Sequence, residues 1–240
     1  MFRMYFKRLG GSRMNLYKSN DTYLVHMYKD RDEWKSKRIK GIGGSDASVL
    51  VGMNPWKDTN TLWKEKNGII RIEDISNKDV VAYGTAAEEH LRNLFVLDYP
   101  NYEVQYMDNT TLQSTKYPWM LYSPDGLLVE KSTGRKGIWE CKTSLINNRT
   151  QKEKWNHRIP DYYYIQVLHG LLVTGFDFIV LKAQLKEVWK DGSVHLDTRH
   201  YLINREEVSE DLEWLLKNEI EQYTKYYLNN IEPPTLLPNI

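Results

Sequence analysis

The chain has 240 residues and a formal net charge of +1, with 41% hydrophobic and 27% charged residues. This composition supports one large core, so we expect a single domain over residues 31–240 after an N-terminal segment, residues 1–30, of uncertain structure. The only cysteine, Cys141, excludes an internal disulfide and a cysteine-based zinc site. No stretch approaches the roughly 20 apolar residues of a membrane span or the apolar run of a signal peptide, so we expect a cytoplasmic protein.

Helical patterns dominate the first hundred residues, after a loop expected at residues 10–12. Four helices are predicted, at about residues 32–38, 45–51, 59–67 and 77–97. Ser45 is suited to cap the second helix, since its hydroxyl accepts an otherwise unpaired backbone N–H. Thr59 or Asn60 is suited to cap the third.

Strand patterns dominate the remainder of the chain. Six strands are predicted, at residues 102–106, 119–122, 126–130, 138–143, 178–186 and 194–203. A helix from Pro160 to Thr174 separates the first four strands from the last two, and Asn204 caps a closing helix. Helices before and after a largely consecutive set of strands predict an α/β fold, with a central mixed sheet flanked by helices.

Three charged side chains lie close together in the predicted strand region. Asp125 belongs to the turn Ser123-Pro124-Asp125-Gly126, and Glu140 and Lys142 belong to the strand Trp139-Glu140-Cys141-Lys142-Thr143. Because side chains alternate along a strand, Glu140 and Lys142 share one face, and Cys141 points the other way as a core residue. Two carboxylates beside one ammonium group suit phosphodiester hydrolysis with a divalent cation. The alternative is an ordinary hairpin with a solvated face.

Metal binding follows from the oxygen atoms that this arrangement supplies. Asp125, Glu140 and the backbone carbonyl of Cys141 form an oxygen cage for one or two Mg²⁺ or Mn²⁺ ions. An ordinary lysine has a pKa of about 10.4 and is a poor base at neutral pH. We therefore expect Lys142 to orient the reactants and stabilise charge.

The segment Gly41-Ile42-Gly43-Gly44-Ser45-Asp46 has the features of a phosphate site. Glycines let backbone N–H groups approach an anion, and the N-terminus of the following helix adds partial positive charge. Arg38 adds a forked donor, and Lys35, Lys37 and Lys40 make its surroundings basic. A plain loop is the alternative interpretation.

Four segments, taken in order, carry a family resemblance. They are Trp34 to Ala47, which holds the glycine segment; Tyr83-Gly84-Thr85-Ala86-Ala87-Glu88; Ser123 to Thr143, which holds the acids; and Tyr162-Tyr163-Tyr164-Ile165-Gln166-Val167-Leu168-His169-Gly170, continuing to Gly175. This set resembles the YqaJ-type viral recombinase family, relatives of lambda exonuclease within the PD-(D/E)XK nuclease superfamily. The matches span more than half of the chain.

The resemblance implies a restriction-endonuclease-like α/β/α core and a role for seven residues. Asp125, Glu140 and Lys142 match the residues that carry the reaction in the family. Glu88 matches the helical acid of the metal site, and Gln166 matches the glutamine of the family motif. Arg38 and Ser45 match the residues that bind a 5′-terminal phosphate. Two alternatives stay open: a surface ion pair between Glu88 and Arg92, and a core role for Gln166. Glu89 stands where the family often has proline, so either Glu88 or Glu89 is expected to face inward.

The activity implied is that of a metal-dependent DNA exonuclease, acting 5′ to 3′ on linear double-stranded DNA. In a phage or prophage setting the exposed 3′ strand passes to a single-strand annealing recombinase, in the host cytoplasm, and the relatives' ring trimers imply a homotrimer. One rival is an endonuclease or nickase on the same fold, because folds host several functions. The other is a non-catalytic DNA-binding protein, against which the intact Asp125, Glu140 and Lys142 argue.

Overall fold

The computed structural model describes residues 14–236, so the loop expected at residues 10–12 lies outside them. The helices are α1 (Arg31–Arg38), α2 (Gly44–Leu50), α3 (Thr59–Lys66), α4 (Asp79–Asp98), α5 (Arg149–Glu153), α6 (Asp161–Thr174) and α7 (Ser209–Gln222), with the short turns η1 (Arg205–Val208) and η2 (Tyr223–Leu228) at the two ends of α7. The strands are β1 (Tyr23–Met27), β2 (Tyr102–Gln105), β3 (Thr110–Ser114), β4 (Leu121–Tyr122), β5 (Gly126–Glu130), β6 (Lys136–Leu145), β7 (Phe178–Val188) and β8 (Val194–Asn204).

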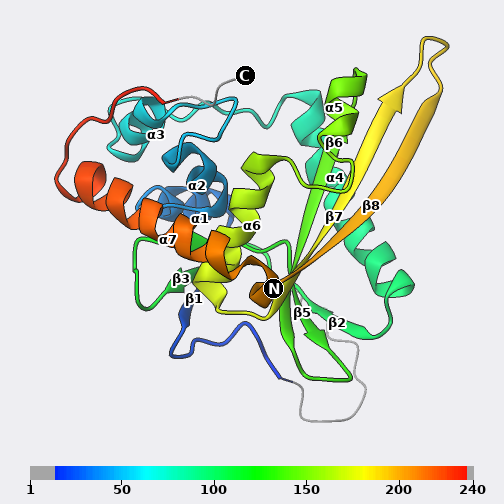
Figure 1. Ribbon diagram of the computed structural model, residues 1–240, viewed down its shortest axis with the longest axis horizontal. Coiled ribbons are helices and arrows are strands. Elements are labelled where there is room, and N and C mark those ends of the chain that lie inside the picture. Colours follow the sequence, from blue (N-terminus) through cyan, green and yellow to red (C-terminus); the bar gives the residue numbers. More distant parts are fainter. Residues whose placement is uncertain (1–13, 237–240) are drawn as a thin grey trace.

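The main sheet has five strands in the order β2-β5-β6-β7-β8. β6 and β7 are parallel, joined through α5 and α6, whereas the other neighbours pair antiparallel. The sheet is therefore mixed, as the sequence predicts. The β7–β8 hairpin extends beyond the body of the molecule, at the upper right of Figure 1.

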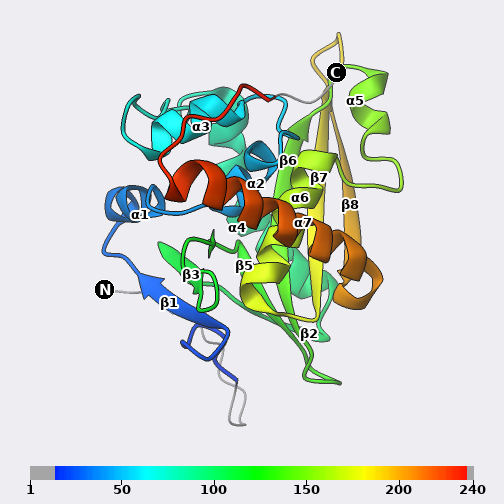
Figure 2. The same ribbon diagram turned by 60° about the vertical axis from the view of Figure 1, so that its left-hand side comes forward.

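Helices cover both faces of this sheet. α6 packs on β6 and β7 and is itself covered by α2 and α7, whereas α4 contacts β6 and β2 from the other side (Figure 2). The alternation of β6 explains the two layers. Ile138 lies in the main core with α6, and Trp139 and Cys141 lie with Leu91 and Phe95 of α4. The predicted α/β architecture, with helices on both sides of a mixed sheet, is confirmed.

A second sheet of three strands, in the order β1-β3-β4, stands beside the first. β1 pairs antiparallel with β3, and an isolated bridge between Ile42 and Met120 ties the glycine segment to this sheet. The sequence pattern does not predict β1 and β3. The reason is that β3, Thr-Thr-Leu-Gln-Ser, lacks a clear apolar alternation, and β1 lies in a stretch without periodicity.

Two predicted helix caps, those of α2 and α3, are wrong. Gly43, not Ser45, is the N-cap of α2, because the Asp46 carboxylate turns back to accept the Gly43 N–H at 3.0 Å. Asp58, not Thr59 or Asn60, caps α3 by accepting the Thr61 N–H at 2.8 Å. Asp58 lies one residue before the predicted helix, and Asp46 lies in the first turn of α2. Asn204 caps the turn η1, as expected for the start of the closing helical region.

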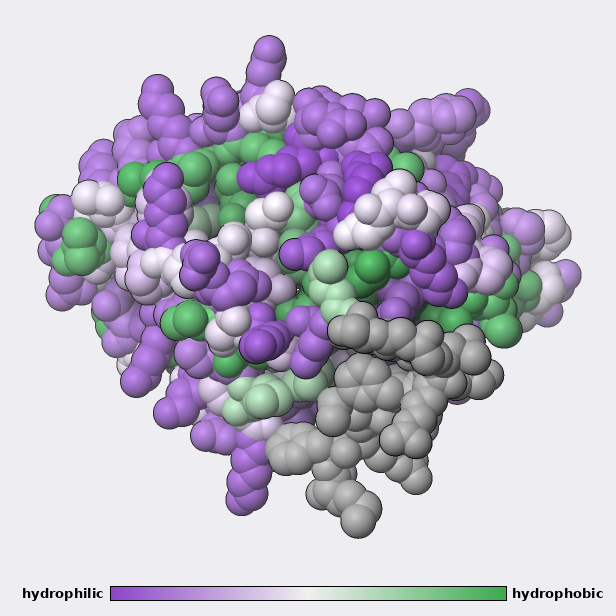
Figure 3. Space-filling view, turned by 90° about the horizontal axis from the view of Figure 1, so that it is seen from below, coloured by the Kyte–Doolittle hydropathy of each residue, from purple (hydrophilic) through white to green (hydrophobic). Residues whose placement is uncertain are grey.

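The surface has the mixed character of the composition. Polar side chains cover most of the face seen from below, with apolar side chains in patches between them (Figure 3). Among residues 14–236 there is no helix that combines the length and apolar character needed to cross a bilayer.

Candidate active site

Glu140 is the centre of the candidate site. It lies on β6 with a side chain that is 1% exposed, and its Oε1 accepts hydrogen bonds from Lys142 Nζ at 2.7 Å and from Gln166 Nε2 at 2.5 Å. Lys142 follows two residues later on the same face of the strand, and Gln166 reaches in from α6. The structure therefore brings together three of the predicted residues, with Lys142 and Gln166 bound to the carboxylate of Glu140.

Tyr122 completes the set of donors on Glu140, and it is not among the site residues predicted from the sequence. Its hydroxyl donates to Oε2 of Glu140 at 2.5 Å. The phenol ring occupies space that two glycines leave free: a Cβ at Gly170 or Gly44 would lie 2.7 or 3.2 Å from it. The only signal in the sequence is position, because Tyr122 directly precedes the turn that carries Asp125.

Asp125 and Glu88 are linked through Arg92. The Asp125 carboxylate accepts the backbone N–H of Cys141 at 2.9 Å, which places it against β6. Arg92 Nη1 donates both to the Asp125 carbonyl at 2.8 Å and to Glu88 Oε1 at 3.0 Å. The ion pair proposed as an alternative for Glu88 is thus present, but on a partly buried side chain next to Asp125. Glu89 is exposed, so Glu88 is the acid that faces inward.

The pKa shifts show that Asp125, Glu140 and Glu88 are close enough to affect one another electrostatically. Burial, followed by the charges of Glu140 and Glu88, raises the pKa of Asp125 well above its ordinary value. Burial also raises the pKa of Glu88, against the lowering effect of Arg92. Burial opposes the charge on Lys142, yet the carboxylates of Glu140 and Asp125 raise the pKa of Lys142 above its ordinary value. The Lys142 ammonium group is therefore protonated at neutral pH, which suits it to orient the reactants and to stabilise negative charge.

The donor chemistry fits a hard divalent cation, although the present contacts are between protein groups. Carboxylates and carbonyls are the ligands that Mg²⁺ and Mn²⁺ prefer, and the mutual repulsion of Asp125, Glu88 and Glu140 is what a cation would relieve. Within residues 14–236, however, no three His, Cys, Asp or Glu side chains are grouped closely enough to hold a metal ion as they stand. Binding requires some of the hydrogen bonds on Glu140 and Glu88 to be exchanged for coordination, so the metal site stays a prediction.

The predicted phosphate residues lie on neighbouring helices. The Arg38 guanidinium, at the end of α1, stacks 4.4 Å from the Trp34 ring centroid, and Trp34 Nε1 donates to Ser123 beside the Asp125 turn at 3.1 Å. Burial lowers the pKa of Arg38, against the opposite effect of nearby carboxylates that include Asp46. A Cβ at Gly43 would lie 2.9 Å from Arg38 Nη2, so a larger residue there would displace the guanidinium from its present position.

Ser45, in the first turn of α2, is exposed and available to an external group. Asp46 already occupies the Gly43 N–H and forms an ion pair with Lys66 at 2.6 Å. The structure therefore holds Arg38 near the site through Trp34 but gives Ser45 no described side-chain contact with Arg38. Their joint role in binding phosphate stays a prediction.

The fold is similar to that of a solved structure, the alkaline exonuclease LHK-Exo from Laribacter hongkongensis. The TM-score is 0.56 with 17% sequence identity, and the match covers 83% of this chain and 96% of that one. The same enzyme in complex with dAMP matches with a TM-score of 0.51 and 19% identity.

Comparison of the amino-acid sequence with protein families identifies the family of this chain. The model of the YqaJ-like viral recombinase domain matches residues 33–177, and the chain belongs to this family. It is 35% identical over 166 residues to the uncharacterised protein YqaJ of Bacillus subtilis, and 27% identical over 172 residues to protein D345L of African swine fever virus. These matches take in 67% and 62% of this chain. The chain spans about half the length of both relatives, 49% in each case.

Proposed function

We propose that the protein is a metal-dependent deoxyribonuclease that digests linear double-stranded DNA from its ends, in the 5′-to-3′ direction. Family membership and the alkaline exonuclease-like fold support the general class. The single observation that carries the proposal is the buried Glu140, which Lys142, Gln166 and Tyr122 hold in one orientation beside Asp125. A buried carboxylate fixed in this way is suited to a catalytic role, since positioned groups lose little freedom during reaction.

The proposed metal site consists of Glu88, Asp125, Glu140 and the backbone carbonyl of Cys141, with one or two Mg²⁺ or Mn²⁺ ions. When bound, the cation would act as a Lewis acid that stabilises the negative charge developing on the phosphate in the transition state of phosphodiester hydrolysis. The protein groups supply orientation. Lys142, held as a cation, donates to a phosphate oxygen or to the attacking water, and Gln166 fixes the geometry of Lys142 through their shared partner, Glu140.

The proposed DNA-end grip consists of Arg38 and Ser45. A guanidinium binds phosphate through two parallel N–H groups, and the hydroxyl of Ser45 adds a further donor. Stacking on Trp34 uses the face of the Arg38 guanidinium, so its edge is the part that we expect to meet an anion. A grip on a terminal 5′-phosphate explains a preference for ends and a 5′-to-3′ direction. The single strand left behind is the substrate of an annealing protein, which we propose as the partner in recombination.

The test uses end-labelled linear duplex DNA with either a 5′-phosphate or a 5′-hydroxyl, in Mg²⁺, Mn²⁺ or EDTA. We expect mononucleotide release that needs a divalent cation, starts at the 5′ end and slows on the hydroxylated substrate. Glu140→Ala and Lys142→Ala should lower the rate by at least about a hundredfold. Glu88→Ala should also be strongly impaired, whereas the matched control Glu89→Ala, at the exposed neighbouring position, should not.

Covalently closed circular DNA separates the proposal from its rivals. Cutting of closed circles at a rate similar to that of linear DNA would favour an endonuclease or nickase. DNA binding without cleavage in any of the metal conditions would favour a non-catalytic DNA-binding protein. A direction of 3′ to 5′ would contradict the assigned role of Arg38 and Ser45.

A further inference from the structure

We propose that Trp56, supported by Tyr162, is a stacking platform that holds one unpaired nucleobase of the DNA strand at the candidate active site. The inference rests on the proposed function, because the occupant is the DNA on which the site acts. Trp56 is 69% exposed, more than any other tryptophan within residues 14–236. An indole ring is a large apolar surface, and here most of it faces solvent.

The loop between α2 and α3 holds this exposed ring in place. Asn54 Oδ1 accepts the backbone N–H groups of Trp56 at 2.9 Å and of Lys57 at 3.0 Å. Asn54 Nδ2 donates to Ser48 Oγ of α2 at 3.0 Å. An asparagine that bonds backbone groups shortly after itself fixes a turn. The indole therefore stands on an ordered loop tied to α2, and a ligand that binds to it pays little ordering entropy.

A series of ring contacts leads from Trp56 to Lys142. The rings of Trp56 and Tyr162 make a T-shaped contact, with 4.5 Å between centroids and 70° between planes. The ring centroids of Tyr162 and Tyr163 are 4.4 Å apart, and Lys142 Nζ lies 5.1 Å from the Tyr163 centroid. The rings of Tyr162 and Tyr163 are thus all that this series has between the indole and the ammonium group of the candidate site.

Helix α6 gives the same direction. Tyr162 lies four residues before Gln166, and residues four apart lie on one face of a helix. Gln166 donates to Glu140, so this face of α6 extends from the catalytic carboxylate to the ring that Trp56 contacts. α2, which ends just before the Trp56 loop, packs against α6 (Figures 1 and 2). A strand bound at Glu140 therefore passes close to the indole.

The geometry of the indole suits an unpaired base. A T-shaped contact uses at most one face of the Trp56 ring, so a flat apolar face stays open. Bases of any sequence stack on such a face. A base inside a duplex already has a neighbour on each side, so only a base at an end or in a single strand is available. The platform thus adds a second element of end recognition to the proposed grip of Arg38 and Ser45.

The chemistry beside the platform selects a nucleotide as the occupant. Lys142 supplies a cation for a phosphate group, and the carboxylates of Asp125 and Glu140 suit a divalent cation that phosphate also binds. An aromatic face next to such a site matches the two parts of a nucleotide, its base and its phosphate. An apolar peptide would match the indole but not these charged groups.

The test uses 2-aminopurine, a fluorescent base whose emission falls when it stacks on an aromatic ring. It is placed at successive positions from the 5′ end of a single-stranded oligonucleotide and of a linear duplex, in Ca²⁺ and in EDTA. The wild type should quench one position near the end. Trp56→Ala should lose this quenching and raise the dissociation constant by about tenfold. Trp56→Phe keeps a ring and should retain most of the quenching, whereas Trp56→Leu should not.

Trp214→Ala is the matched control. Trp214 is 43% exposed and lies on α7, on the outer side of α6. This variant should bind and quench like the wild type. Tyr162→Ala should weaken the quenching because it removes the ring that supports Trp56, and Tyr162→Phe, which keeps that ring, should restore it.

The outcomes separate the platform from the nuclease activity, because binding is measured apart from cleavage. Equal quenching in the wild type and Trp56→Ala, or equal binding by Trp56→Phe and Trp56→Leu, would overturn the inference. So would a changed molar mass of Trp56→Ala with unchanged DNA binding, which would assign the indole to a protein contact. Quenching that depends on Trp56 in a protein that never cuts DNA would support the platform and remove the proposed function.

Discussion

Tyr122 and Glu140 form a buried pair in which the phenolic hydroxyl donates to the carboxylate Oε2 at 2.5 Å. The contact ties β4 of the small sheet to β6 of the main sheet. Because Lys142 and Gln166 both donate to Oε1, Tyr122 is the donor that fixes the second oxygen. The orientation of the candidate catalytic acid therefore depends on a residue that lies in a different sheet.

Tyr122→Phe tests this dependence. Removing the hydroxyl leaves a buried carboxylate oxygen without its donor, which should destabilise the fold by about 1–3 kcal/mol. We also expect kcat for DNA digestion to fall by about tenfold or more, with a smaller change in KM, because the acid is less well oriented. Chemical denaturation and steady-state digestion of labelled duplex DNA measure the two effects.

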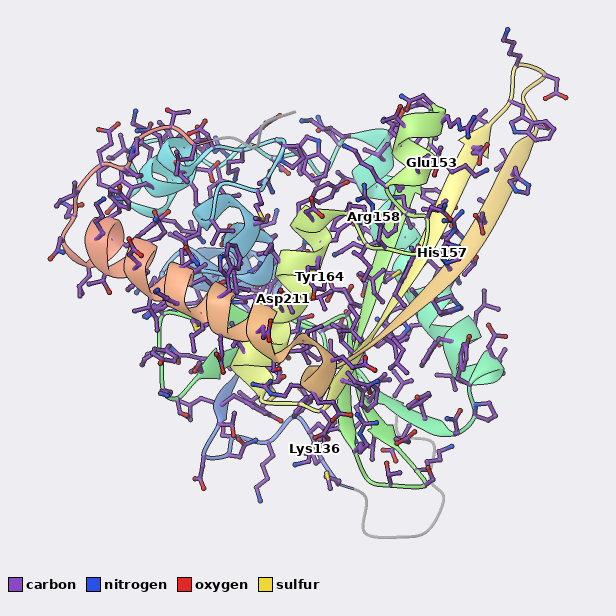
Figure 4. The ribbon with its side chains drawn as sticks, in the orientation of Figure 1. Lys136, Glu153, His157, Arg158, Tyr164 and Asp211 are labelled. Atoms are coloured by element: carbon purple, nitrogen blue, oxygen red, sulfur yellow. The ribbon has the colours of Figure 1, made fainter. Side chains whose placement is uncertain are left out.

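Tyr164→Phe is the matched control. Tyr164 lies on α6, and its hydroxyl donates to Asp211 of α7 at 2.6 Å, away from Glu140 (Figure 4). This variant should retain the wild-type kcat. If Tyr122→Phe had the same kcat as Tyr164→Phe, a positioning role for Tyr122 would be wrong.

Arg92→Lys tests the link between the helical acid and the Asp125 turn. Arg92 is 8% exposed, bonds to both Glu88 and the Asp125 carbonyl, and stacks 3.5 Å from the centroid of the Tyr106 ring. Lysine keeps the charge but lacks the planar fork that spans two acceptors and stacks on a ring. We expect about a tenfold loss of kcat/KM, measured on the same substrate.

Arg135→Lys is the comparison for Arg92→Lys. Arg135 also lies over an aromatic ring, that of Phe178, and bonds to Asn204, at the end of the sheet remote from Glu140. Normal activity in Arg135→Lys together with a loss in Arg92→Lys would support the link. Equal activity in the two variants would argue against it.

The strand pattern predicted the relation between Glu140 and Lys142 but not the contacts that come from elsewhere. Alternation along β6 is a local property, so it placed both side chains on one face and Cys141 on the other. Tyr122 and Arg92 reach the site through the packing of β4 and α4 against β6, which no spacing in the sequence encodes. Arg92 carries one signal, its position four residues after Glu88, which suggests a surface ion pair only as the alternative to Glu88 in the metal site.

In the fold, too, elements with a strong local pattern were predictable, and those that depend on contacts with other segments were not. The long elements α4, α6, β7 and β8 have strong periodicity and were predicted to within a few residues. β1 and β3 were missed because their pairing with each other, not their own pattern, stabilises them. The cap of α2 was wrong because Asp46 competes with Ser45 for the role, and only the geometry of Gly43 decides between them.

Asp125→Asn should stabilise the protein at neutral pH in EDTA. The folded-state pKa of Asp125 is raised by burial and by neighbouring acids, so its charged form costs free energy in the folded state. The protonated form contributes stability at low pH, and this contribution is lost as the pH rises through the raised pKa. Asparagine resembles the protonated form, so its advantage in melting temperature should be present at pH 7 to 8 and shrink toward pH 4.

Addition of Mg²⁺ or Mn²⁺ to the same two proteins tests the metal site without measuring activity. A cation held by Asp125 should raise the melting temperature of the wild type and have less effect on Asp125→Asn. The matched control is Asp211→Asn, whose carboxylate lies on α7 and bonds to Tyr164. An equal metal-induced shift in all three proteins would count against Asp125 as a ligand.

His169 and Glu219 form a buried pair that should make stability depend on pH. His169 Nδ1 lies 2.9 Å from Glu219 Oε1, and its Nε2 lies 3.0 Å from the Leu121 carbonyl, with both side chains 0% exposed. Both partners are acceptors, so the ring satisfies them only as a doubly protonated cation. Burial opposes that charge, but the Glu219 carboxylate and the two hydrogen bonds raise the pKa of His169 above its ordinary value.

The sign of the effect follows from this direction. The unfolded-state pKa of histidine is about 6.5, so the stabilisation is complete below that pH and is lost as the pH rises through the higher folded-state pKa. His169→Gln should lose about 3–5 kcal/mol at pH 6, because it leaves the buried Glu219 charge without a cation. The difference between wild type and variant, measured by urea denaturation at several pH values, should narrow as the pH rises. The stability of a double variant, His169→Gln/Glu219→Gln, which lacks both charges, should not show the pH dependence of the wild type. If the difference between the wild type and His169→Gln did not change with pH, His169 would not be a buried cation.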